Sequence, residues 1–266
     1  PPSYLPSPSL SPPSLAALPS QDMAGVSHVY FNILLAISQL LGFTFVIITG
    51  FFYNTIGEGF QWGKKGVGSG NIGNINLHAL FMSSGLVFLQ GEALLSFRLY
   101  RRDVKLISKF IHFMTHSLSL AMAGIGLYTI IEHKKLDKIE QFKTVHSWIG
   151  VGLLGAYLVQ YFFGVLIFGL GIMPLSVRAT FHPIHRGLGM ILFGIATGQA
   201  LLGSVEYIGI AEGLPSFQCY STLSCLSHLD WVWNCNVVIV VLYSSSVLTL
   251  VVPSVWKRHK TPDEEE

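Results

Sequence analysis

The chain has 266 residues, of which 51% are hydrophobic and only 11% are charged, and its formal net charge is +2 at pH 7. A soluble domain has about 25% charged residues, so this composition excludes a soluble enzyme and a disordered chain. The basic residues form no stripe over a polar fold, which argues against nucleic acid as a partner. We therefore expect an integral membrane protein, with membrane lipid as its surroundings.

Residues 1–28 form an N-terminal segment that is rich in Pro and Ser and is expected to be disordered or extended. The segment has no basic n-region and is therefore not typical of a signal peptide. Met23 begins a stretch suited to a natural start, which would make residues 1–22 an upstream extension.

Six later stretches are long and apolar enough to cross a membrane, for which about 20 apolar residues are needed. They are residues 29–53, 76–100, 106–131, 145–170, 185–208 and 229–252. Their residues do not alternate in polarity, so helices are favoured over a β-barrel. The predicted fold is all-α, a six-transmembrane-helix bundle over residues 29–252, followed by a charged tail at 253–266.

Basic residues gather in the connectors that a six-span topology puts on one side of the membrane. They are Arg98, Arg101, Arg102, Lys105 and Lys109 after the second span, Arg178 and Arg186 after the fourth, and Lys257, Arg258 and Lys260 after the sixth. The opposite connectors are mixed or acidic. The positive-inside rule then predicts that both termini are cytoplasmic.

The three cysteines are too few for a disulfide scaffold. Cys219 and Cys225 share a connector and could pair only if that connector faces an oxidising compartment. Cys235 lies in an apolar run and is expected to be a small core residue.

Four histidines stand near the N-terminal ends of successive spans, about one turn inside each: His78, His112, His146 and His185. Ionisable residues inside spans are costly and are usually functional. Because successive helices run in opposite directions, His78 is level with His146 near the outer face. By the same argument, His112 is level with His185 near the inner face.

Two histidine pairs at opposite depths suit two haems, each with an imidazole on either side of the iron. Such iron has no open position, which favours electron transfer over oxygen activation. With each ligand one turn inside the membrane, the two irons are expected about 20 Å apart. A single histidine at a helix end is usually only a capping or interfacial residue, but four that are level in pairs favour ligands.

Two other iron chemistries fit the histidine spacing less well. His112 with His116 and His182 with His185 resemble the boxes of membrane di-iron desaturases, but the HxxHH clusters of those enzymes are missing. Ferric reductases of the NADPH oxidase type stack two histidines about 13 residues apart on one helix. Here the corresponding pair, His133 and His146, is divided by a charged connector.

Residues from about 76 to 207 resemble the cytochrome b561 family of ascorbate-dependent transmembrane electron carriers. The resemblance rests on INLHALFMSSGLVFLQGEALLSFR, KFIHFMTH, TVHSW, PLSVRATFHPIHRGLG and GQALLGSVE. It implies two haem b groups between the central four helices, with His78 and His146 as ligands of the outer iron and His112 and His185 as ligands of the inner iron. It also implies a homodimer.

The resemblance also implies residues that bind the substrates. Lys109, Lys105 and Arg178 would hold the ascorbate anion near the inner haem, with Arg98 as a weaker candidate, although loop charge of the positive-inside kind is the alternative for these residues. His133 would lie beside the acceptor, monodehydroascorbate or a ferric chelate.

Three further positions can be compared with the family pattern. His116 matches a family histidine and would lie beside the inner haem, one turn deeper than His112, with plain packing as the alternative. Ala79 follows His78 where the family commonly has proline, and Glu92 is an acid inside the second span with no assigned partner.

The expected function is electron transfer from cytoplasmic ascorbate, through two bis-histidine haem b groups, to an outer-side or lumenal acceptor. The membrane would be the plasma membrane or that of an endosome, lysosome or secretory vesicle. One alternative is a haem-bearing membrane anchor that feeds a quinone pool for a partner dehydrogenase. Another is a histidine-lined metal transporter without haem.

Overall fold

The computed structural model describes residues 20–62, 72–211 and 228–257. These residues form helices and contain no strand. The helices are α1 (Ser20–Thr55), α2 (Gly73–Met82), η1 (Ser83–Leu89), α3 (Gln90–Leu99), α4 (Lys105–Leu136), α5 (Val145–Gly164), η2 (Val165–Gly169), α6 (Leu175–Ala211) and α7 (His228–Val251). The segments η1 and η2 are π-helical turns that join α2 to α3 and extend α5.

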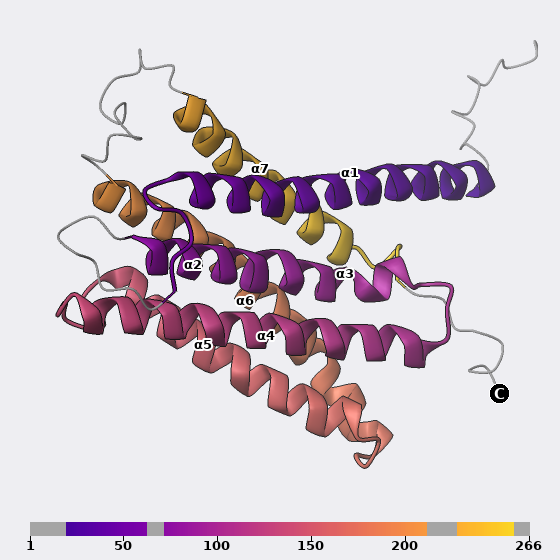
Figure 1. The fold of residues 1–266 in the computed structure, drawn as a ribbon. Helices are drawn as coiled ribbons and strands as arrows, with labels where there is room; N and C mark the ends of the chain where they lie inside the picture. Colours follow the sequence, from indigo (N-terminus) through magenta and orange to yellow (C-terminus); the bar gives the residue numbers. More distant parts are fainter. Residues whose placement is uncertain (1–19, 63–71, 212–227, 258–266) are drawn as a thin grey trace, which may run out of the picture.

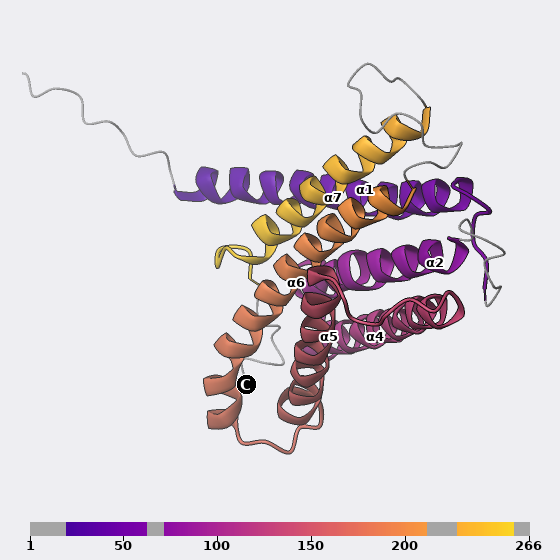
Figure 2. The same ribbon diagram turned by 90° about the vertical axis from the view of Figure 1, so that its left-hand side faces the viewer.

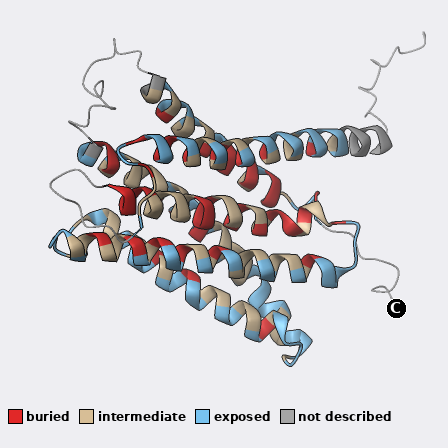
Figure 3. Cartoon of the chain, in the orientation of Figure 1, coloured by how far each residue is buried: buried red, intermediate tan, exposed pale blue. Residues whose placement is uncertain are grey.

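Six helices in this part of the chain are long and apolar enough to span a membrane, which confirms the predicted all-α bundle. The second span, α2–η1–α3, is one continuous helix and is the most buried of the six. It packs against α1, α4, α6 and α7, so it forms the centre of the bundle. Figure 3 shows buried residues concentrated along it.

Three spans form a layer, and two further spans pack across one side of that layer. In Figures 1 and 2, α1, the α2–η1–α3 helix and α4 are stacked as the layer. The pair α5 and α6 runs across that layer, and α7 crosses α1 diagonally. α5 packs mainly against α6, and these two helices carry two of the four candidate ligands, His146 and His185.

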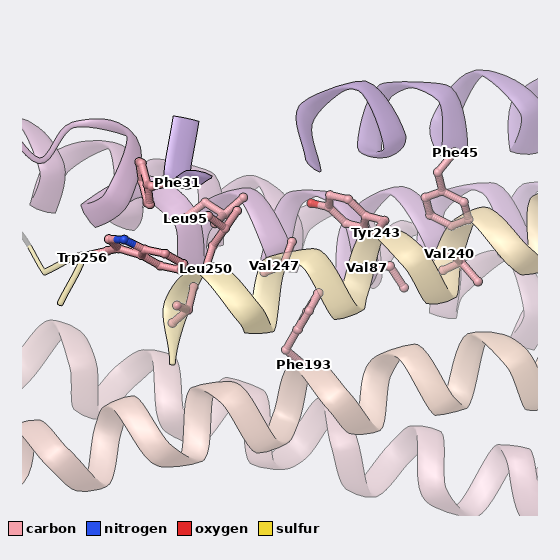
Figure 4. Close-up of a cluster of buried hydrophobic side chains, with 11 residues drawn as sticks. Phe31, Phe45, Val87, Leu95, Phe193, Val240, Tyr243, Val247, Leu250 and Trp256 are labelled. Atoms are coloured by element: carbon pink, nitrogen blue, oxygen red, sulfur yellow. The ribbon is translucent and has the colours of Figure 1, made fainter. Parts of the chain in front are cut away.

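The peripheral helices α1 and α7 are fastened to the centre by an apolar cluster (Figure 4). Its buried members are Phe31, Phe45, Val87, Leu95, Phe193, Val240, Tyr243, Val247, Leu250, Val251 and Trp256. Trp256 lies beyond α7, in the segment that the sequence assigned to a charged tail, and its Nε1 donates a hydrogen bond to Ser27 Oγ at 3.0 Å. Trp256 is therefore part of the packed structure, although it lies beyond α7.

The connector after α3 also packs onto α1. The guanidinium of Arg101 lies 4.1 Å from the centre of the Phe31 ring, a cation–π contact. Burial, with the nearby charge of Arg102, lowers the pKa of Arg101 from its ordinary value.

Several boundaries differ from the expectation. α1 begins at Ser20 and so includes residues 20–28, and α6 begins at Leu175 rather than at 185. The apolar run marks only the part of a helix inside hydrocarbon, whereas the polar turns before His185 continue α6 and carry Pro183. His185 is therefore ten residues from its helix start, not one turn.

The expectation for Cys235 is wrong, since its side chain is exposed on α7. In a membrane helix both the core face and the lipid face are apolar, so an apolar run does not tell one face from the other. Cys219 and Cys225 lie outside the described residues.

Candidate functional site

The four predicted ligands come together as two pairs. The ring centres of His78 on α2 and His146 on α5 are 6.2 Å apart, and those of His112 on α4 and His185 on α6 are 6.3 Å apart. An iron atom about 2 Å from a nitrogen of each ring would hold the ring centres about 6 Å apart. Both pairs therefore fit a bis-histidine iron, although no pair of rings is parallel.

The two pairs lie at opposite ends of the bundle. His78 Nδ1 lies 2.9 Å from the backbone oxygen of Gly126 on α4. Gly126 follows His112 by 14 residues, which is about 21 Å along a helix. This separation agrees with the spacing of about 20 Å expected between two metal sites.

Backbone carbonyls orient two of the four rings. Nδ1 of His78 and Nδ1 of His112 donate to the oxygens of Gly126 and Ala93, at 2.9 and 2.8 Å. A histidine whose Nδ1 carries the proton keeps a lone pair on Nε2 for a metal. The donor chemistry of these two histidines therefore fits haem iron.

The other two rings lie against glycines. A Cβ added at Gly203 would meet Cε1 of His146 at 2.7 Å, and one added at Gly164 would meet Cε1 of His185 at 3.0 Å. The imidazoles occupy the space that any larger residue would fill, so these glycines set the position of both rings.

His116 lies beside the inner pair, with its ring centre 4.4 Å from that of His112. Its Nδ1 is 2.6 Å from the Tyr157 hydroxyl, which donates to Ser119 Oγ at 3.1 Å. Ser119 in turn donates to the Gly85 carbonyl in η1 at 2.7 Å. This buried polar chain joins α4, α5 and η1 between the two histidine pairs.

Three cations gather at the end of the bundle that holds His112 and His185. Lys109 Nζ donates to the Phe168 carbonyl at 3.2 Å. The ring centres of Phe168 and His185 are 5.2 Å apart. Lys105 and Arg178 are close enough to Lys109 for their charges to act on it. Nε of Arg178 is buried and has no hydrogen-bond partner among the described residues. The cluster has the positive charge to hold an anion, and Arg178 adds a buried donor without a partner in the described structure.

Arg98, in contrast, is committed to the end of α7. Its guanidinium is buried and donates to the carbonyls of Val251 and Pro253 at 2.6 and 2.7 Å. Arg186 donates to the carbonyls of Val251 and Val252, both at 2.8 Å.

At the opposite end, His133 is buried on the last turn of α4, with Nδ1 3.4 Å from the Asp137 carboxylate. Sequence reasoning did not assign two other charged residues to the outer pair. Lys134 acts electrostatically on both His78 and His146, and Glu206 acts on His146. The only sequence signal for Glu206 was its place at the end of the GQALLGSVE motif.

Glu206 is held by the helix start that carries the ligand. Thr144 caps α5, accepts a hydrogen bond from Ser147 N, and donates through Oγ1 to Glu206 Oε2 at 3.2 Å. The cap therefore joins the beginning of α5 to the end of α6 at the outer site.

Glu92, which had no assigned partner, lies between α1, α3 and α7. Its carboxylate accepts from Gln39 Nε2 at 2.9 and 3.1 Å and from the Tyr243 hydroxyl at 3.0 Å. The hydrogen bonds of Glu92 are therefore with the peripheral helices α1 and α7.

Comparison with known proteins supports the resemblance. The family model for eukaryotic cytochrome b561 matches residues 77–208. The chain is 30% identical over 230 residues to the pig (Sus scrofa) transmembrane ascorbate-dependent reductase CYB561, covering 86% of each protein. It is 28% identical over 243 residues to a putative homologue of that reductase in Caenorhabditis elegans, covering 88% of each.

A differently named relative is similar over the same extent of this chain. The mouse (Mus musculus) plasma membrane ascorbate-dependent reductase CYBRD1 is 27% identical over 231 residues, which are 86% of this chain and 76% of the relative. With its matching family model, its six membrane spans and its paired histidines, the chain belongs to the eukaryotic cytochrome b561 family.

Proposed function

We propose that this protein transfers electrons across the membrane from cytoplasmic ascorbate to monodehydroascorbate or a ferric chelate on the other side. The observation that carries the proposal is the pair of facing histidine couples at opposite ends of one bundle. The relatives are named ascorbate-dependent reductases, which supports ascorbate as the donor.

Two haem b groups per chain would be held by these histidines, one by His112 and His185 and one by His78 and His146. When bound, haem supplies reversible one-electron chemistry at an iron that has no open position. The protein holds the rings at their spacing and depth, and surrounds them with apolar helices.

Lys109, Lys105 and Arg178 would bind ascorbate at the cytoplasmic end. An ammonium group has three donors, so Lys109 keeps two for a ligand beyond its bond to the Phe168 carbonyl. The Arg178 guanidinium adds a buried donor with no partner in the described parts of the chain. His116 would act on the inner site through its contact with His112.

At the other end, His133 would lie near the acceptor, and we add Lys134 and Glu206 to that region because both act on the outer histidines. Lys134 could pair with an organic anion at this end of the bundle. The Glu206 carboxylate could contact the metal of a chelate.

The basic end of the bundle supports a cytoplasmic location for both termini. We propose the plasma membrane or the membrane of an endosome, lysosome or secretory vesicle as the compartment, and a homodimer as the assembly. We also propose residues 29–252 as the electron-transfer domain.

The first test is an absorption spectrum of the purified protein with haem quantified per chain, before and after addition of ascorbate. Two haems per chain that ascorbate reduces are expected. A colourless protein, or a single haem that ascorbate does not reduce, would overturn the proposal.

The second test is Lys109→Ala compared with Arg102→Ala, which removes an exposed cation from the same end. Loss of one charged contact of about 1.4 kcal/mol slows a reaction about tenfold, so we expect that reduction in the rate with ascorbate for Lys109→Ala alone. Dithionite should reduce both variants like the parent protein. Equal ascorbate rates in the two variants would contradict the assignment of the donor site.

A further inference from the structure

The helices α5 and α6 carry the same spaced pattern, H-x3-G-x4-G-x4-Q-x3-G. In α5 it consists of His146, Gly150, Gly155, Gln160 and Gly164, and in α6 of His185, Gly189, Gly194, Gln199 and Gly203. Each copy begins at a candidate iron ligand.

The contacts between the two copies are reciprocal. Gly203 packs against the ring of His146, and Gly164 packs against the ring of His185. Gln160 Nε2 donates to the His185 carbonyl at 2.6 Å, and Gln199 Nε2 donates to the His146 carbonyl. Each helix thus positions the ligand of the other with one glutamine and one glycine.

The symmetry ends at the ring nitrogens. Gln199 Nε2 also lies 2.9 Å from Nδ1 of His146, whereas Gln160 is bonded only to the backbone of His185 in the described structure. Oε1 of Gln199 is buried and has no partner among the described residues. The outer site therefore has an amide at the ligand ring that the inner site lacks.

An imidazole that binds iron through Nε2 must carry its proton on Nδ1, and that N–H then needs an acceptor. His78 and His112 use the carbonyls of Gly126 and Ala93. At His146 the side chain hydrogen-bonded to Nδ1 is that of Gln199, whose unpartnered oxygen is an acceptor.

We propose that Gln199 is a positioning residue that tunes the outer haem site, with Oε1 accepting the Nδ1 proton of His146. In this arrangement the amide turns so that Oε1 faces Nδ1 while Nε2 stays on the His146 carbonyl, and the buried Oε1 gains the partner that it lacks. The inference rests on the proposed function, because it requires a haem iron between His146 and His78.

The hydrogen bond has a measurable consequence. Donation from Nδ1–H to an amide oxygen makes the imidazole a more basic ligand and favours the oxidised iron. The bond thus lowers the reduction potential of the outer haem and leaves the potential of the inner haem unchanged.

The experiment is a spectroscopic redox titration of the haem-loaded protein in three variants: Gln199→Leu, Gln199→Glu and Gln160→Leu. Gln160→Leu is the matched control, because it removes the equivalent backbone bond without touching a ring nitrogen. We expect Gln199→Leu to raise the outer potential, Gln199→Glu to keep it at or below the parent value because an acceptor remains, and Gln160→Leu to shift neither potential.

An unchanged outer potential in Gln199→Leu, or an equal shift in Gln160→Leu, would overturn the inference. If Gln199→Leu loses the outer haem, Gln199→Glu decides: retention of that haem supports the acceptor role, and its loss refutes it. Failure of the proposed function is recognised separately, because the parent protein would then lack two titrating haems.

Discussion

At the scale of single residues, the positions of the candidate ligand rings depend on glycines as much as on histidines. His146 and His185 each lie on a helix of the pair α5 and α6 and press against a glycine of the other helix. A glycine leaves room for the rigid imidazole, whereas the Cβ of any other residue would lie too close to the ring.

Gly203→Ala tests this dependence. The new methyl group would lie 2.7 Å from Cε1 of His146, a ring carbon that can move only with the whole imidazole. Such overpacking costs about 1–3 kcal/mol, so the ring is expected to shift and the haem content to fall from two towards one per chain. A pyridine haemochrome assay measures this content.

Gly209→Ala is the control for this substitution, because a Cβ at Gly209 meets no atom within 4 Å. Alanine favours a helix over glycine by about 1 kcal/mol in both variants. Reduced helix formation therefore cannot explain a loss seen only in Gly203→Ala. Full haem content in both variants would refute the role of Gly203.

The pairing of the four histidines could be predicted from the sequence because alternate spans begin on the same side of the membrane, which sets the rings level in pairs. The side chains that contact these rings could not be predicted. Gln199 and Glu206 reach His146 only because α6 crosses α5 at a particular rotation. An apolar pattern in a membrane helix does not reveal that rotation, since lipid and protein interior are equally apolar.

At the scale of the elements, helix ends and helix irregularities explain what the hydropathy pattern missed. The π-helical turn η1 begins with Ser83 and Ser84 inside the predicted second span, and its Gly85 carbonyl accepts a hydrogen bond from Ser119 on α4. The polar turns of α6 before His185 lie outside the apolar run, so the predicted span began ten residues late.

Two arginines from other helices bond the carbonyls at the end of α7. Arg98 and Arg186 both donate to the Val251 carbonyl, and Arg98 also bonds the Pro253 carbonyl. This arrangement satisfies carbonyls that a helix C-terminus leaves free. It joins α3 and α6 to α7, so the basic charge at this end is partly structural.

Arg98→Met should therefore destabilise the bundle without affecting the donor site. Hydrogen bonds of a charged group contribute about 1.5–3 kcal/mol, so the thermal unfolding midpoint, measured by loss of the haem absorption band, is expected to fall by several degrees. The exposed Arg102, substituted as Arg102→Met, provides the comparison and should leave the midpoint in place. A slower rate with ascorbate in Arg98→Met, at unchanged stability, would instead assign Arg98 to substrate binding.

At the scale of the whole molecule, the two ends of the bundle differ in charge. Lys105, Lys109 and Arg178 gather at the end of the inner histidine pair, whereas a cation, Lys134, and an anion, Glu206, both act on His146 at the other end. A donor that is an anion is attracted to the first end from solution. The positive-inside rule would assign the same end to the cytoplasm, so the proposed orientation and the proposed direction of electron transfer rest on one distribution of charge.

This orientation predicts a labelling pattern with a membrane-impermeant thiol reagent. The probes are Arg102→Cys at the basic end and Glu140→Cys at the other, both at exposed positions, in a chain whose three native cysteines are replaced by serine. Cells are labelled intact, then after opening of the plasma membrane alone, and then after all membranes are dissolved.

Arg102→Cys is expected to react only once the plasma membrane is opened, whichever compartment holds the protein, because the proposed orientation turns its end to the cytoplasm. Glu140→Cys should react in intact cells if the protein is in the plasma membrane, and only after internal membranes are dissolved if it is in a vesicle. Reaction of Arg102→Cys in intact cells, or of Glu140→Cys on opening the plasma membrane alone, would reverse the orientation. The basic cluster would then face away from cytoplasmic ascorbate, and the proposed direction of electron transfer would be wrong.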